Sequence, residues 1–276
     1  MLTPMLDRDS FQMLDLLYRR SDRFRLADDA LGGREERLSE RSAYSALWGL
    51  TSCCPHGDAL TELVPRSAAP YRGVNLRLYD LFVLHFTSPR AWGCTADELS
   101  HMYRRHLSHN HAEVGVGSGY FLSNHGRADW TQISLIDPNP AALQYVSRRL
   151  TTPAVNRHVA DILDATTLPQ QRYKSVGANY VLHCLDTTGD SKKTAIANLA
   201  RLTADDGTLF GATVLGDAEH NRLGQVLMRI CNATGAFNNT TDDEASLRQH
   251  LSAHFHSVHV ERRRAVAIFT ATGPIR

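Results

Sequence analysis

The sequence Asn110-His-Ala-Glu-Val-Gly-Val-Gly-Ser-Gly-Tyr-Phe-Leu122 decides the fold class of this chain. Its first part is apolar and strand-like, its centre holds three glycines, and its last residues begin an apolar helix. Glycines let a backbone turn tightly and bring a ligand against main-chain N–H groups at a helix N-terminus. The stretch therefore predicts a strand–loop–helix unit that binds a cofactor.

The spacing of these glycines separates two classes of cofactor. A dinucleotide fingerprint needs Gly-x-Gly-x-x-Gly, and its third glycine would fall on Tyr120. Here Gly115, Gly117 and Gly119 are one residue apart, and Glu113 lies two residues before the first. This spacing matches the pattern of S-adenosylmethionine (SAM) sites, so we expect these four residues to bind SAM. The alternative is a glycine-rich turn without a ligand.

Acidic residues follow the next two expected strands. Asp137 and Pro138 close the second strand, where a carboxylate accepts hydrogen bonds from ribose hydroxyls. The alternative for Asp137 is a helix N-cap. Asp161 and Ile162 follow the third strand, and we expect Asp161 to accept the adenine amino group while Ile162 packs on the ring. The alternative for Asp161 is an aspartate that solvates a loop.

Further polar and aromatic residues are candidates for the reactive end of the site. Asn179 and Tyr180 follow the fourth strand, where they would hold the amino-acid part of SAM or a substrate. His183 is a candidate base by its ordinary pKa, and the alternative is a histidine hydrogen-bonded within its loop. Tyr79 and Trp92 precede the sheet, and we expect them to cover the cofactor unless they are plain core aromatics.

Strands and helices alternate from about residue 76 onward. Strands are expected at 111–116, 132–136, 155–160, 175–182, 208–215, 257–261 and 266–270. Helices are expected at 96–107, 119–125, 141–150, 191–202, 219–234 and 243–254, the first with a capping box from Thr95 and Glu98. The alternation predicts an α/β fold with a doubly wound, mainly parallel, seven-stranded sheet. Four residues join the last two strands, too few for a helical crossover, so these strands should form an antiparallel hairpin.

The composition limits the classes of function. The chain has 276 residues and a formal net charge of +1, which gives no basic field for a nucleic-acid partner. Five scattered cysteines indicate neither a disulfide framework nor a metal site, and no apolar run reaches the roughly 20 residues of a membrane helix. We expect a cytoplasmic protein with a small-molecule substrate. Residues 1–75 are expected to form a helical extension or cap before a SAM-binding domain at 76–276, and they are candidates for a homodimer contact.

The sequence resembles small bacterial and fungal class I SAM-dependent methyltransferases of the methyltransferase-domain-12 kind over residues 76–273. The resemblance rests on Tyr79-Asp-Leu-Phe-Val83, Trp92-Gly-Cys94, the glycine stretch, Asp137-Pro-Asn-Pro140, Asn179-Tyr-Val-Leu-His-Cys-Leu185, Phe210-Gly-Ala-Thr213 and residues 232–243. It implies a Rossmann-like fold and SAM contacts from Glu113, Gly115, Gly117, Asp137, Asp161 and Asn179. Glu113 stands where aspartate is commoner, and residues 1–70 have no counterpart.

The resemblance implies methyl transfer to an oxygen, nitrogen or sulfur of a small molecule. One alternative is a SAM-using enzyme that does not methylate but closes the aminobutyrate chain of SAM into azetidine-2-carboxylate and releases methylthioadenosine. Asn179 and Tyr180 would then orient and deprotonate the amine.

Overall fold

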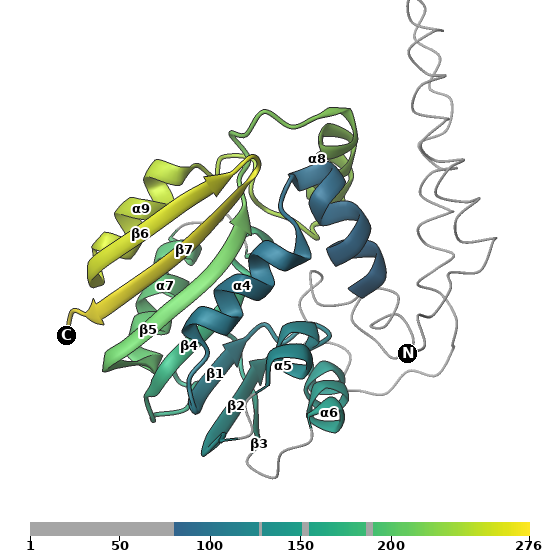
Figure 1. Cartoon of the computed structure of the whole chain (residues 1–276). Helices are drawn as coiled ribbons and strands as arrows, with labels where there is room; N and C mark the ends of the chain where they lie inside the picture. The colour runs from purple at the N-terminus through teal and green to yellow at the C-terminus, as the bar shows by residue number, and fades with distance from the viewer. Residues whose placement is uncertain (1–79, 127–128, 151–154, 186–189) are drawn as a thin grey trace, which may run out of the picture. The chain divides into compact units, whose positions relative to one another are not determined.

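The computed structural model describes residues 80–126, 129–150, 155–185 and 190–276 (Figure 1). Their strands are β1 (Asn110–Val114), β2 (Gln132–Asp137), β3 (Val155–Val159), β4 (Tyr173–Asn179), β5 (Thr203–Val214), β6 (Phe255–Arg263) and β7 (Val266–Pro274). Their helices are η3 (Asp80–Trp92), α4 (Ala96–His106), α5 (Tyr120–His125), α6 (Pro140–Arg149), η4 (Leu182–Cys184), α7 (Ser191–Leu202), α8 (Arg222–Thr234) and α9 (Glu244–Ser252). None of these helices is long and apolar enough to cross a membrane.

The strands form one sheet in the order β3-β2-β1-β4-β5-β7-β6. Strands β1 to β5 pair in parallel, whereas β7 pairs antiparallel with both β5 and β6. The expected mainly parallel sheet with an antiparallel C-terminal hairpin is therefore confirmed. The strand order reverses between β1 and β4, which is where an open α/β sheet forms a ligand crevice.

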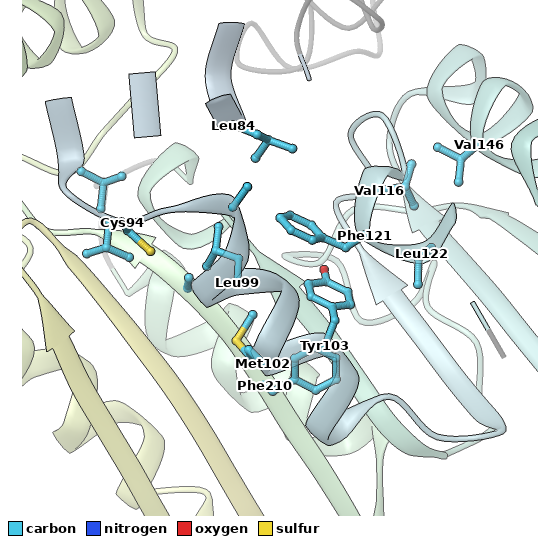
Figure 2. Close-up of a cluster of buried hydrophobic side chains, with 14 of the residues drawn as sticks. Leu84, Cys94, Leu99, Met102, Tyr103, Val116, Phe121, Leu122, Val146 and Phe210 are labelled. Atoms are coloured by element: carbon cyan, nitrogen blue, oxygen red, sulfur yellow. The ribbon is translucent and has the colours of Figure 1, made fainter. Parts of the chain in front are cut away.

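Helices cover both faces of the sheet (Figure 1). Helices α4, α5 and α6 pack on one face, and α7 and α9 pack on the other, each over its own buried cluster. In the first cluster the Tyr103 ring stacks on Phe121 with centroids 4.7 Å apart and meets Phe210 edge-on at 5.1 Å (Figure 2). Because large aromatic side chains bury more area than aliphatic ones, this trio anchors α4 and α5 to the sheet.

Side chains that cap the helices explain where several elements begin. Thr95 and Glu98 form the expected capping box at the start of α4. Asn139 caps α6 by accepting from the Ala141 N–H at 3.0 Å, and Asp243 caps α9 by accepting from the Ser246 N–H at 2.6 Å. Such caps satisfy N–H groups that have no partner within the helix.

The structure corrects some expected boundaries. Strand β4 ends at Asn179 instead of residue 182, because Tyr180 adopts φ 58° and the turn η4 follows. Helix α8 begins at Arg222 instead of residue 219, because Asn221 caps it by accepting from the Gly224 N–H. The predicted N-terminal helices, the division at residue 75 and the proposed dimer contact lie outside the described residues.

Candidate functional site

A cavity of about 520 Å³ lies at the carboxyl ends of β1, β2, β3 and β4. Its wall comes from the β1–α5 loop, from the residues that follow β2, β3 and β4, and from the loop after α8. This volume falls in the range of small-molecule sites. The cavity brings together most of the predicted site residues: Glu113, Gly115, Gly117, Gly119, Asp137, Pro138, Asp161, Ile162, Asn179 and Tyr180.

The three loop glycines all adopt left-handed backbone conformations. The φ angles of Gly115, Gly117 and Gly119 are 70°, 50° and 67°. A Cβ on Gly115 would lie 2.4 Å from Val181 Cγ2, and one on Gly119 would lie 2.5 Å from Val146 Cγ1. A Cβ on Gly117 would meet no atom within 4 Å. The outer glycines are therefore required by packing, whereas Gly117 borders open space beside the cavity.

Glu113 lines the cavity, and two buried side chains hold its carboxylate. It is 5% exposed, its Oε1 accepts the Tyr103 hydroxyl, and its Oε2 lies 2.9 Å from His111 Nε2. Burial, and secondly the charge of Glu113, raise the pKa of Tyr103, so this hydroxyl remains a donor. An ionised carboxylate has about four lone-pair sites, so Glu113 keeps accepting capacity for a ligand.

Asp137 ends β2 with both carboxylate oxygens on main-chain donors. Oδ2 accepts from the Val116 N–H at 2.9 Å, and Oδ1 accepts from the Asn139 N–H at 2.8 Å. Asn139, not Asp137, is the N-cap of α6. Burial raises the pKa of Asp137 to about 6, although both N–H groups oppose that shift. The carboxylate is thus fixed to the glycine loop, and it titrates close to neutral pH.

Asp161 and Ile162 lie at the end of the cavity formed by the residues after β3. Asp161 Oδ1 accepts from the Leu163 N–H at 2.9 Å and so shapes the turn that places Ile162 on the cavity wall. Ile162 is 5% exposed. Asp161 therefore supports its own loop and also borders the cavity.

Asn179 and Tyr180 follow β4 with different constraints. Asn179 Oδ1 is buried and has no hydrogen-bond partner among the described residues, and Asn179 lines the cavity. An unpaired buried acceptor costs about 1–3 kcal/mol, which a ligand donor would recover. The Tyr180 hydroxyl lies 2.6 Å from Ser88 Oγ, which itself donates to the Cys94 carbonyl at 2.7 Å. Because Ser88 has one proton, Tyr180 donates to it and links η3 to the end of β4.

His183 lies outside the residues that line the cavity. Its Nδ1 accepts from the Val214 N–H at 3.3 Å, and its ring packs edge-on against Phe237 with centroids 4.4 Å apart. Burial, and secondly the positive charge of Lys192, lower the pKa of His183 to about 3. These observations favour the alternative left open by the sequence, a histidine hydrogen-bonded within its own region.

Of the two aromatic residues expected to cover the cofactor, the structure describes only Trp92. Trp92 is 3% exposed and lies in the core against His220 and Phe237, with centroids 5.6 Å and 5.9 Å away, and it does not line the cavity. Tyr79 lies outside the described residues.

Sequence reasoning gave no role of their own to several residues of the wall, namely Leu84, Cys184, Leu185, Gly235 and Asn238. Gly235 and Asn238 fall within residues 232–243, which carried part of the family resemblance but received no role. The glycine and the asparagine pair in that stretch were the available signal.

The wall is mainly apolar, and the charged residues that the described part of the chain places in it are all acidic. None of the described lining residues is a histidine, lysine or arginine. Burial and the nearby Cys231 raise the pKa of the Cys184 thiol to about 12, which keeps it protonated. The described residues hold no group of three or more His, Cys, Asp or Glu side chains that could bind a metal ion.

Comparison with known proteins identifies a family model and relatives that match this chain. The family model described as "Methyltransferase domain" matches residues 90–254. The chain is 38% identical to the uncharacterised protein YbcY of Escherichia coli (strain K12), over 66% of this chain and 95% of that protein. It is 34% identical to demethylluteothin O-methyltransferase of Streptomyces thioluteus, over 80% of this chain and 97% of that enzyme.

The fold has solved counterparts. The structure of the DhpI–SAH complex matches 78% of this chain and 99% of that chain, with a TM-score of 0.55 and 15% sequence identity. At this identity the likeness shows a shared fold.

Proposed function

This chain belongs to the methyltransferase domain family, and from that membership we propose that it transfers the methyl group of SAM to an acidic hydroxyl of a small molecule. When bound, SAM supplies a methyl group on a positively charged sulfur. The single observation that carries the proposal is the cavity in which the glycine loop, Asp137 and Asn179 meet at the switch point of the sheet.

The residues of the wall fit the parts of SAM. Asp137 would accept from the ribose hydroxyls, while Asp161 and Ile162 would hold the adenine. The unpaired Asn179 Oδ1 and the fixed Glu113 carboxylate suit the α-ammonium group, which donates up to three hydrogen bonds. Gly117 leaves space where a side chain would block the loop.

The absence of a basic side chain among the described lining residues bears on the acceptor. With His183 outside the wall and the carboxylates of Glu113, Asp137 and Asp161 assigned to the cofactor, no further side chain of the described wall is a candidate base for an ordinary alcohol. A phenolic or enolic hydroxyl ionises far more readily and needs only orientation and desolvation. The oxygen forms a bond to the methyl carbon, the carbon–sulfur bond breaks with its electron pair left on sulfur, and the hydroxyl proton passes to solvent.

The named relative is an O-methyltransferase, which supports oxygen as the acceptor atom. It gives no support to ring closure of SAM.

A product assay tests the proposal. We would incubate the purified protein with SAM and either 1-naphthol, 1-naphthylamine or 1-naphthalenethiol, and identify the products by mass spectrometry. We expect S-adenosylhomocysteine (SAH) and methoxynaphthalene with 1-naphthol alone. Methylation of only the amine or the thiol would contradict an oxygen acceptor, and methylthioadenosine formed from SAM alone would contradict methyl transfer.

A further inference from the structure

The loop after α8 supplies a part of the cavity wall that the cofactor residues do not use. Gly235 ends α8 with φ 75°, and Asn238 follows three residues later; both line the cavity. A Cβ on Gly235 would meet no atom within 4 Å, so the wall beside it borders open space.

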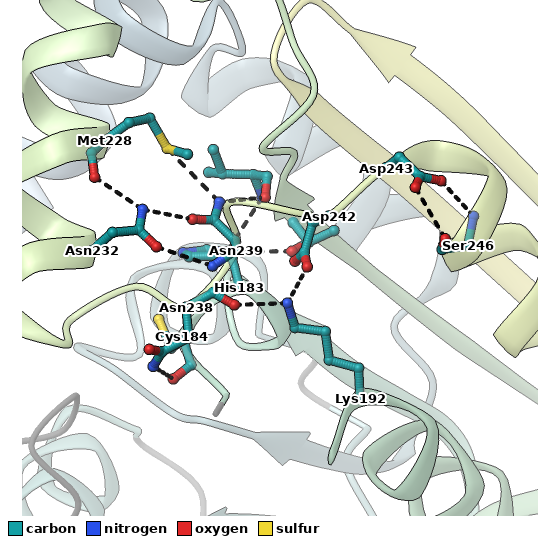
Figure 3. Close-up of polar contacts among 12 residues, drawn as sticks. His183, Cys184, Lys192, Met228, Asn232, Asn238, Asn239, Asp242, Asp243 and Ser246 are labelled. Atoms are coloured by element: carbon teal, nitrogen blue, oxygen red, sulfur yellow. Dashed lines mark hydrogen bonds and ion pairs between the residues drawn. The ribbon is translucent and has the colours of Figure 1, made fainter. Parts of the chain in front are cut away.

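This loop is built to keep its shape (Figure 3). Asn239 is 0% exposed, and its Nδ2 donates to the Val214 carbonyl of β5 at 2.9 Å. Asn232 of α8 makes two hydrogen bonds to Asn239. Its Nδ2 donates to Asn239 Oδ1 at 3.1 Å, and its Oδ1 accepts from the Asn239 N–H at 3.2 Å. The loop is therefore fixed to both α8 and β5.

The backbone of Asn238 is fixed as well. Its N–H donates to the His183 carbonyl at 2.8 Å, and its own carbonyl accepts from Lys192 Nζ at 2.8 Å. Lys192 also pairs with Asp242, and both side chains are largely buried, at 17% and 12% exposed (Figure 3). Lys192 thus fixes the loop through the Asn238 carbonyl and the Asp242 carboxylate.

The side chain of Asn238 is less committed than its backbone. Its Nδ2 makes one long contact, 3.4 Å, with the Cys184 carbonyl. No residue in the described part of the chain hydrogen-bonds its Oδ1. An amide held in place with a free acceptor on a cavity wall can orient a hydroxyl, although it cannot take up a proton.

The position of Asn238 along the sheet separates it from the cofactor residues. Asp137 and Asp161 follow β2 and β3, at one end of the strand order, whereas Asn238 is bonded to the segment after β4, on the other side of β1. The cavity extends to both sides of β1. Leu185 lines the cavity directly after Cys184, whose carbonyl Asn238 contacts, and its apolar side chain suits a flat hydrocarbon ring.

We propose that Asn238 is the specificity-determining residue for the methyl acceptor, whose hydroxyl donates to Asn238 Oδ1 while its ring lies beside Gly235 and Leu185. The inference rests on the proposed function and names the subsite that the acceptor uses. The ligand it selects is a ring-bearing hydroxyl compound.

Binding to the SAH-loaded protein tests this without turnover. We would titrate 1-naphthol and naphthalene into wild type, Asn238→Ala and Gly235→Asn by calorimetry, and titrate SAM into each protein separately. We expect Asn238→Ala to weaken 1-naphthol binding at least tenfold, to leave naphthalene binding within twofold, and to leave SAM affinity within twofold. Gly235→Asn should weaken the binding of both ring compounds, because the new side chain fills the open space. Asparagine suits this position since it tolerates φ above zero.

Each result decides the inference. Equal 1-naphthol affinity in wild type and Asn238→Ala, or no 1-naphthol binding to a wild-type protein that binds SAM, would overturn the subsite and leave the proposed function standing. Failure of wild type to bind SAM would instead remove the proposed function. If Asn238→Ala fails to fold, as judged by its SAM titration, Gly235→Asn carries the test: unchanged affinity for both ring compounds contradicts the subsite.

Discussion

His111 and Glu113 lie two residues apart on β1 and contact each other at the buried side of the cavity wall, with His111 Nε2 2.9 Å from Glu113 Oε2. The other ring nitrogen of His111 lies 2.8 Å from Ser175 Oγ on β4. Gly177 on β4 leaves room for the pair, since a Cβ there would lie 2.4 Å from Glu113 Oε2. The carboxylate expected to face the cofactor is therefore set by residues from three elements, with Tyr103 of α4 the third.

Removing the Tyr103 hydroxyl should destabilise the fold. Tyr103→Phe takes a donor from a buried carboxylate, so we expect the free energy of unfolding to fall by about 1–3 kcal/mol in urea titrations. Tyr145→Phe is the matched control, because no described residue hydrogen-bonds the Tyr145 hydroxyl and its side chain is partly exposed. Equal losses in the two variants would contradict a role for the Tyr103–Glu113 contact.

SAM affinity should depend on pH through Asp137. Its pKa of about 6 means that the carboxylate gains a proton as the pH falls through 6 and loses capacity to accept from ribose hydroxyls. We expect affinity to be constant above pH 7 and about tenfold weaker at pH 5. Asp137→Asn should bind weakly with no such change. A wild-type profile that stays flat from pH 7 to pH 5 would count against the ribose role.

Substituting alanine for the loop glycines should destabilise the protein by different amounts. Gly117→Ala introduces a side chain at φ 50° into open space, so we expect a loss of about 1–2 kcal/mol in stability together with a loss of SAM affinity. Gly115→Ala adds a clash with Val181 to a similar backbone cost, and we expect a further loss of about 1–3 kcal/mol. Thermal unfolding of both variants measures the difference. A smaller loss for Gly115→Ala than for Gly117→Ala would refute the packing argument.

His183 should make the protein less stable in acid. The unfolded chain takes up a proton near pH 6.5, whereas the folded protein keeps His183 neutral down to about pH 3. Between these values the unfolded state binds more protons than the folded state. The free energy of unfolding therefore decreases as the pH is lowered, by about 2 kcal/mol from pH 7 to pH 5. His183→Gln should lose this part of the pH dependence while the remaining groups keep theirs. Identical slopes for the two proteins would show that His183 titrates normally.

Much of the fold was predictable because its signals are local. The glycine spacing and the alternation of strands and helices depend on neighbouring residues, and they identified every strand of the sheet. The ends of elements were less predictable. β4 stops at Asn179 because Tyr180 takes a left-handed conformation, which few non-glycine residues adopt.

The same distinction holds for the site: residues placed by the local sequence were predictable, and residues placed by distant contacts were not. Glu113, Asp137 and Asp161 follow strands directly, so their place at the sheet edge could be read from the chain. His183 and Trp92 were predicted by side-chain chemistry, but Phe237, far along the chain, packs against both of them in the core. Asn238 was missed because its position depends on Lys192 and the His183 carbonyl, which no local pattern connects to it.

Calorimetric titration of SAM tests the central claim most directly. The account predicts that wild type binds one SAM per chain, that Gly117→Arg abolishes binding, and that Val226→Arg, which adds the same side chain at an exposed position on α8, binds as wild type does. Undiminished SAM binding by Gly117→Arg would contradict the assignment of this cavity.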